Sequence, residues 1–139
     1  MAIFEVRGGN VLNGEVRLSG AKNAALPILF GSLMSDEVVE LRNVPVLMED
    51  IRIALEIIKS IGATVQVDEN NVTIDPSGIA DQSLPLELVS RIRYSLLLLG
   101  VFLSRFGKVE LPFPGGCDIG TRKFDLHIKG LQDLGAEME

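Results

Sequence analysis

The chain resembles itself at a spacing of about seventy residues, and this internal repeat is the strongest constraint on its fold. Segments 28–41 and 97–111 each contain an apolar helical run, a short turn and an alternating Val-Glu-Leu stretch typical of a strand. Gly31 corresponds to Gly100 in this comparison, and Gly62 corresponds to Gly135. A duplication of this kind indicates two copies of one supersecondary unit.

Each copy is expected to run strand, helix, strand, helix, strand, which predicts a mixed α/β (α+β) fold. The expected helices are 22–34, 48–61, 91–104 and 124–134, and a glycine that favours helix termination follows the second helix of each copy. The expected strands are 15–20, 38–41, 65–67, 72–74 and 109–111, with a hairpin turn between the third and the fourth. We therefore divide the chain into N-terminal strands (1–20), a first unit (21–84) and a second, truncated unit (85–139).

Composition excludes several classes of protein. A chain of 139 residues with 47% hydrophobic and 23% charged residues is typical of a soluble globular domain. The formal net charge of −6 disfavours nonspecific nucleic-acid binding, and the most apolar run, 96–103, is too short to span a membrane. A single cysteine cannot form an internal disulfide, and the N-terminus lacks a signal-peptide pattern, so we expect a cytoplasmic protein.

The loop 113–122 contains the first group of candidate functional residues. The spacing between corresponding positions of the two copies is larger after this loop than before it, so the loop carries three extra residues in the second copy. Loops added to a rigid frame often carry function. Cys117 follows two glycines and precedes Arg122, and a nearby cation lowers the pKa of a thiol from its usual value of about 8.5. The alternative interpretation is that Cys117 is a small buried hydrophobic residue.

A second group of candidates lies at the start of the helix expected at 22–34. Free N–H groups at a helix start favour anions, whereas a lysine there opposes the helix dipole, so an anionic ligand would explain Lys22 and Asn23. The alternative is a solvated lysine at a turn. Lys22 corresponds to Arg91, expected in the first turn of the helix 91–104, and Arg93 follows it. We therefore expect two anion sites.

Metal binding and nucleotide-binding loops are not indicated. One cysteine and one histidine, His127, do not form a metal-ligand set, and the sequence around Cys117 lacks the spacing of a phosphate-binding loop. His127 is interpreted as a half-exposed helical residue.

Four features together resemble a known family: SGAKNAALPIL at 19–29, the PGGC loop with Arg122 after it, DLHIKGL at 125–131, and the two Gly-Ala pairs at 62–63 and 135–136. They resemble the enolpyruvyl transferases, and among them the UDP-N-acetylglucosamine 1-carboxyvinyltransferases. The resemblance implies transfer of the enolpyruvyl group of phosphoenolpyruvate to the 3′-hydroxyl of UDP-N-acetylglucosamine with release of phosphate. It also implies repeated βαβαββ units in an inside-out α/β barrel, of which this chain would hold about one and a half.

The resemblance also implies roles for individual residues, and it implies no cofactor. Cys117 would donate a proton to the methylene carbon of phosphoenolpyruvate. The substrate-binding residues would be Lys22 and Asn23 for phosphoenolpyruvate, Arg93 for the substrate anions, Arg122 for phosphate, and Lys123, Phe124, Asp125 and Leu126 for the UDP-sugar.

The chain departs from the family at Lys123 and Phe124, where the family usually has proline and then valine or isoleucine. A paralogue with another nucleotide-linked acceptor is therefore one alternative. The family's general base and a further arginine come from the second half of the full enzyme, so we expect this chain to be an incomplete and inactive part of it. It would self-associate or pair with the remainder. A truncated, non-catalytic homologue that binds a ligand or a partner is the other alternative.

Overall fold

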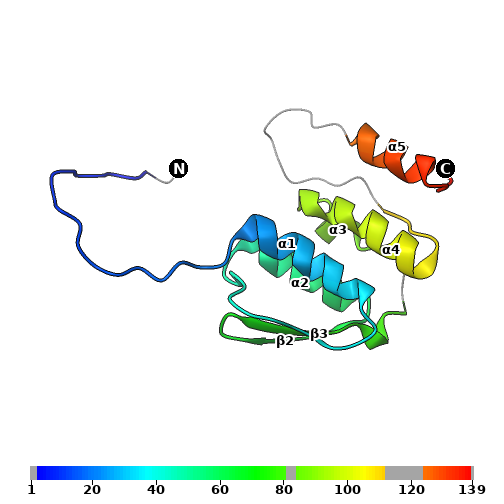
Figure 1. Ribbon diagram of the computed structural model, residues 1–139, viewed down its shortest axis with the longest axis horizontal. Helices are drawn as coiled ribbons and strands as arrows, with labels where there is room; N and C mark the ends of the chain where they lie inside the picture. The colour runs from blue at the N-terminus through cyan, green and yellow to red at the C-terminus, as the bar shows by residue number, and fades with distance from the viewer. Residues whose placement is uncertain (1–2, 81–83, 112–123, 139) are drawn as a thin grey trace.

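Helices pack against one face of a small sheet in the computed structural model, which describes residues 3–80, 84–111 and 124–138 (Figure 1). The helices are α1 (Lys22–Gly31), α2 (Glu49–Ser60), α3 (Leu86–Val89), α4 (Leu98–Phe106) and α5 (Asp125–Asp133). Short 3₁₀ helices are η1 (Ser32–Met34), η2 (Pro76–Gly78) and η3 (Arg93–Leu97). The strands are β1 (Val39–Leu41), β2 (Thr64–Asp68) and β3 (Asn71–Asp75).

The strands of the described residues form one antiparallel sheet in the order β1-β3-β2. Ile74 of the central strand lies opposite both Val39 and Val65, and Val72 lies opposite Leu41 and Val67. Ile74 and Val72 are fully buried and belong to the same core cluster as apolar residues of α1, α2 and α4. The predicted hairpin between β2 and β3 is confirmed.

An aliphatic core joins the helices to the sheet. All apolar side chains of α2 are buried, including Ile51, Ile57 and Ile58. Leu29 of α1 and Phe102 of α4 belong to the same cluster, so segments from both predicted copies share one core. A core of this size is the main stabilising contribution to the fold.

The predicted helices of the first copy are confirmed, whereas its first strand is wrong. The expected helix 22–34 corresponds to α1 followed by η1, and the expected helix 48–61 corresponds to α2. Residues 15–20 form no strand, and Val16 and Leu18 are 85% and 81% exposed. An alternating sequence becomes a strand only where a neighbouring backbone accepts and donates its hydrogen bonds. Figure 1 shows this N-terminal segment extending away from the helices and the sheet.

The second copy agrees with prediction only in part. The expected helix 124–134 is confirmed as α5, but the expected helix 91–104 begins later, as η3 followed by α4. The strand expected at 109–111 is wrong, because only Glu110 makes an isolated β-bridge. In the first copy, by contrast, β1 pairs with β3 along its whole length. The division into 1–20, 21–84 and 85–139 stays a prediction.

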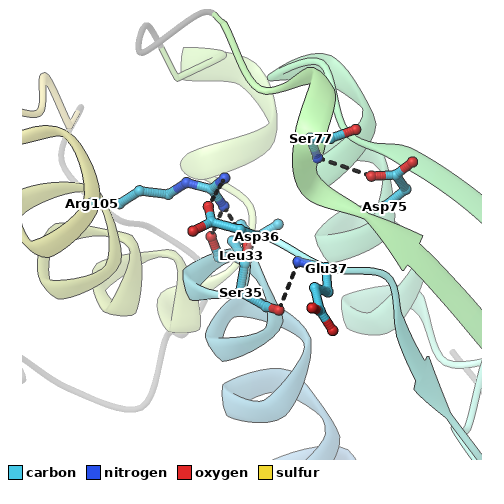
Figure 2. Close-up of polar contacts among 7 residues, drawn as sticks. All are labelled: Leu33, Ser35, Asp36, Glu37, Asp75, Ser77 and Arg105. Atoms are coloured by element: carbon cyan, nitrogen blue, oxygen red, sulfur yellow. Dashed lines mark hydrogen bonds and ion pairs between the residues drawn. The ribbon is translucent and has the colours of Figure 1, made fainter.

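Arg105 of α4 connects the two predicted copies (Figure 2). Its guanidinium donates hydrogen bonds to the carbonyl of Leu33, to the carbonyl of Ser35 at 2.8 Å and to Oδ1 of Asp36 at 3.0 Å. Only 17% of the Arg105 side chain is exposed. The Leu33 carbonyl lies in η1 and the Ser35 carbonyl directly follows it. Carbonyls at a helix end lack partners within the helix, so Arg105 satisfies them from another element.

Asp75 ends β3 and caps η2, also shown in Figure 2. Its Oδ1 accepts a hydrogen bond from the backbone N–H of Ser77 at 3.0 Å. Hydrogen bonds from the side chain and then the backbone of Ser77 hold the pKa of Asp75 below its ordinary value. Because the folded pKa is depressed, this contribution to stability is present at neutral pH and is lost as the pH falls through the pKa of folded Asp75.

Two glycines, one inside α5 and one just after it, are expected to respond in opposite directions to alanine. Gly135 has a φ of +100° and follows α5, with hydrogen bonds from its N–H to the Gln132 carbonyl and from the Ala136 N–H to the Leu131 carbonyl. Gly130 lies inside α5, and a Cβ at either glycine meets open space. Gly135→Ala should destabilise α5 by about 1–2 kcal/mol, since L-residues disfavour positive φ. Gly130→Ala should stabilise α5 by about 0.5–1 kcal/mol.

Amide hydrogen exchange within α5 measures both changes. None of the side chains of α5 is fully buried, so the helix is expected to open locally, without unfolding of the core. Changes of the same sign in the two variants would contradict the assignment of Gly135 as the residue that terminates α5.

Candidate functional site

Gly20 fixes how the chain enters α1. A Cβ at this position would lie 1.9 Å from the carbonyl oxygen of Asn43 and 3.1 Å from Cδ of Pro45. No side chain fits there, so glycine allows the segment before α1 to lie against the loop between β1 and α2. This close approach brings the start of α1 next to the start of α2.

Lys22 is the first residue of α1, as predicted, and it forms an ion pair with α2. Its Nζ lies 2.7 Å from Oδ2 of Asp50, and the two side chains are 40% and 36% exposed. Asp50 therefore supplies a counter-charge to a lysine whose position opposes the dipole of α1. The placement of Lys22 is thus explained within the chain, and its contact with an anionic ligand stays a prediction.

Arg91 lies outside the helix in which it was expected. It occupies the turn after α3, and its Nη2 lies 2.7 Å from Oε1 of Glu49. The expected position in a first helical turn is wrong because η3 begins only at Arg93. Glu49 and Asp50 are consecutive residues in the first turn of α2, where the helix dipole favours negative charge. The first turn of α2 therefore contacts both the start of α1 and the turn after α3.

Asn23 and Arg93 lie at the starts of two elements that contact each other. Asn23 is the exposed second residue of α1, and Arg93 is the half-buried first residue of η3, which packs against α1. Buried Ser95 holds the turn before η3, because its Oγ lies 3.0 Å from the carbonyl oxygen of Val89 and 2.6 Å from that of Ile92. No sequence pattern singles out Ser95, since its partners are backbone carbonyls.

The candidates of the second copy are described only in part. Cys117, Arg122 and Lys123 lie outside the described residues. Phe124 precedes α5, and Asp125 and Leu126 are its first two residues, both exposed. Asp125 in the first turn of α5 is favourable for the helix dipole. That these residues join Lys22, Asn23 and Arg93 in one site stays a prediction.

A shallow groove of about 580 Å³ runs beside α1. Its lining residues are Gly20, Ala21, Ala24, Ala25, Ile28 and the segment 40–44. Neither Lys22 nor Asn23 lines this groove, so it is a different surface from the predicted anion site.

Metal-binding groups and membrane-spanning helices are both absent from the part of the chain that the structure describes. Within 3–80, 84–111 and 124–138, no group of three or more His, Cys, Asp or Glu side chains is arranged to hold a metal ion. No helix in these same ranges has the length and apolar character needed to cross a membrane.

The sequence profile of EPSP synthase (3-phosphoshikimate 1-carboxyvinyltransferase) matches residues 6–139 of this chain. The chain belongs to the EPSP synthase family. Within this family, it is 48% identical over 136 residues to a UDP-N-acetylglucosamine 1-carboxyvinyltransferase of Psychromonas ingrahamii, a match that covers 98% of this chain and 32% of that protein. A protein of the same name from Yersinia pestis is 45% identical over 136 residues, with the same coverage.

This EPSP synthase family member is also similar to a solved structure of an enolpyruvyl transferase. The enolpyruvyl transferase NikO from Streptomyces tendae matches with a TM-score of 0.63 and 34% identity, over 72% of this chain and 23% of that chain. The mixed α/β fold class and the resemblance to enolpyruvyl transferases are therefore confirmed. The chain spans about a third of the length of the curated relatives that it matches.

Proposed function

We propose that the whole protein transfers the enolpyruvyl group of phosphoenolpyruvate to the 3′-hydroxyl of UDP-N-acetylglucosamine and releases phosphate, the first committed step of peptidoglycan synthesis. The observation that carries this proposal is 48% identity over 98% of the chain to a protein named UDP-N-acetylglucosamine 1-carboxyvinyltransferase. The family name refers to a different acceptor, 3-phosphoshikimate, so the choice of UDP-N-acetylglucosamine depends on the relatives and not on the family name. A single cysteine in these 139 residues suits a reducing compartment, so a cytoplasmic location is part of the proposal.

The proposed chemistry divides between a proton donor and a set of cations. Cys117 protonates the methylene carbon of phosphoenolpyruvate, and this creates an oxocarbenium-like centre that the sugar hydroxyl attacks. The sugar hydroxyl gives up its proton to the family's general base, and the phosphate then leaves, with its charge stabilised by Lys22 and Arg122. The new methyl group loses one proton, which restores the carbon–carbon double bond of the enolpyruvyl product. Asn23 and Arg93 complete the anion site, and the segment 123–126 contacts the UDP-sugar.

The described geometry supports one part of this arrangement. Helix α1, which carries Lys22 and Asn23, packs against η3, which begins with Arg93. The starts of these elements are held by the close approach at Gly20 and by the buried hydroxyl of Ser95. Rigid placement of this kind is what an anion site requires before the substrate arrives.

The departure at Lys123 and Phe124 favours a second candidate, the same transfer to another nucleotide-linked acceptor. Phosphate release from phosphoenolpyruvate by the whole protein distinguishes the two. We expect release with UDP-N-acetylglucosamine and none with shikimate-3-phosphate. Release only with a different UDP-sugar would support the second candidate. No release with any acceptor, together with retained ligand binding, would support a non-catalytic binding protein.

The 139 residues alone are expected to be inactive in the same assay, because they cover about a third of the length of relatives with this activity in their names. The family's general base would come from the remaining part, and loss of a general base typically lowers rates by about 10²–10⁴-fold. Self-association, or pairing with that remaining part, is part of the proposal.

A further inference from the structure

We propose that Asp50 is a positioning residue for this reaction, which holds the ammonium group of Lys22 in the place where it meets the anionic part of phosphoenolpyruvate. The inference rests on the proposed function and extends it to a residue outside the predicted set of site residues. Its basis is the 2.7 Å contact between Lys22 Nζ and Asp50 Oδ2.

The backbones on both sides of this contact are fixed by the core. Helices α1 and α2 pack directly against each other. Leu26 on α1 and Ile51 on α2, each close to its helix start, are fully buried. The close approach of Gly20 to the Asn43 carbonyl sets the entry into α1. The long Lys22 side chain extends from this fixed backbone to Asp50.

A lysine side chain is among those that lose most rotamer freedom when they are held in one place. The charge-assisted hydrogen bond to Asp50 restricts that freedom before any ligand binds. With side chains 40% and 36% exposed, this pair is less accessible to solvent than the pair that Glu49 of α2 forms with Arg91. A ligand that meets a pre-positioned ammonium group loses less affinity to side-chain ordering.

Glu49 provides a matched comparison. It is the neighbouring acid in the same helical turn, and it pairs with Arg91 at 2.7 Å, with side chains 67% and 49% exposed respectively. Charge alone predicts that removal of either carboxylate strengthens the binding of an anion. Positioning predicts that removal of Asp50 weakens binding, because Lys22 then has more conformations to lose.

The test measures phosphoenolpyruvate binding to the whole protein by calorimetry. We expect Asp50→Ala to weaken binding about fivefold and Glu49→Ala to leave it within about twofold of the wild type. In a Lys22→Gln background, Asp50→Ala should have no further effect, since the residue that it positions is absent. Equal or tighter binding by Asp50→Ala, or an undiminished loss in the Lys22→Gln background, would overturn the proposal.

A second measurement separates this inference from the proposed function. The rate at which a limiting acetylating reagent modifies Lys22 is compared with that of Lys129, whose ion pair with Asp133 serves as an internal reference. Asp50→Ala should raise the rate at Lys22 and leave the rate at Lys129 unchanged. Faster labelling with unchanged phosphoenolpyruvate affinity would overturn the positioning role alone. Absence of phosphoenolpyruvate binding to the wild-type protein would overturn the proposed function and the ligand role of Asp50 together.

Discussion

Replacement of Cys117 by alanine in the whole protein is expected to lower kcat for phosphate release by about 10²–10⁴-fold. The methylene carbon of phosphoenolpyruvate must gain a proton before the sugar hydroxyl can attack, and alanine has no proton to donate. Binding of phosphoenolpyruvate should change much less, because the proposed anion contacts come from Lys22, Asn23, Arg93 and Arg122. The measurement is steady-state phosphate release, with substrate binding determined separately.

Alkylation provides the control for this substitution. Cys117 is the only cysteine of these 139 residues, so a labelled peptide from this segment identifies the site directly. Alkylation of Cys117 should inactivate the wild-type protein to the level of the Cys117→Ala variant. Undiminished turnover by Cys117→Ala would show that the proton comes from another group, and the proposed role of Cys117 would then be wrong.

Arg105→Ala is expected to lower the free energy of unfolding by about 1–3 kcal/mol, since the loss of this partly buried donor removes hydrogen bonds to the carbonyls of Leu33 and Ser35. Arg105 contacts the carbonyls of Leu33 and Ser35 and the carboxylate of Asp36, and its side chain is 17% exposed. Urea unfolding of the chain, followed by circular dichroism, gives the change. The predicted loss exceeds that of an exposed ion pair because two of the three acceptors are backbone carbonyls.

Arg91→Ala is the matched control. Arg91 makes one ion pair, with Glu49, and about half of its side chain is exposed. Pairs of this kind contribute about 0–1 kcal/mol. A loss as large for Arg91→Ala as for Arg105→Ala would show that the charge of the arginine, and not its bonds to the carbonyls, determines the effect.

The parts of the fold that were predictable from the sequence depend on neighbouring residues. The apolar stripe of α2 and the hairpin between β2 and β3 are each encoded within a short stretch of chain, so periodicity and turn composition were sufficient. The start of α1 at Lys22 was predicted for the same reason. The family could also be predicted from the sequence, because SGAKNAALPIL at 19–29 and DLHIKGL at 125–131 are motifs typical of enolpyruvyl transferases.

The parts that were not predictable depend on partners far away in the chain. Segment 15–20 has the alternation of a strand, and only the structure shows that it does not pair within the described residues. Arg105 contacts residues about seventy positions earlier, and no local pattern indicates that the arginine of this apolar helix makes such contacts. The pairs Lys22–Asp50 and Arg91–Glu49 join residues 28 and 42 positions apart, so charge composition alone could not assign them.

The close approach between Gly20 and the Asn43 carbonyl has a consequence for how the SGAKN stretch is used to recognise related proteins. Two nearby residues of this stretch, Gly20 and Lys22, have different roles: the first allows a close backbone approach, and the second carries a charge. Position 20 excludes every side chain because a backbone oxygen would lie 1.9 Å from its Cβ, whatever the protein binds. A glycine at position 20 in a related protein therefore indicates the same close backbone approach and carries no information about the acceptor substrate. A substitution at position 22 would remove the ion pair with Asp50 but would leave this close backbone approach intact.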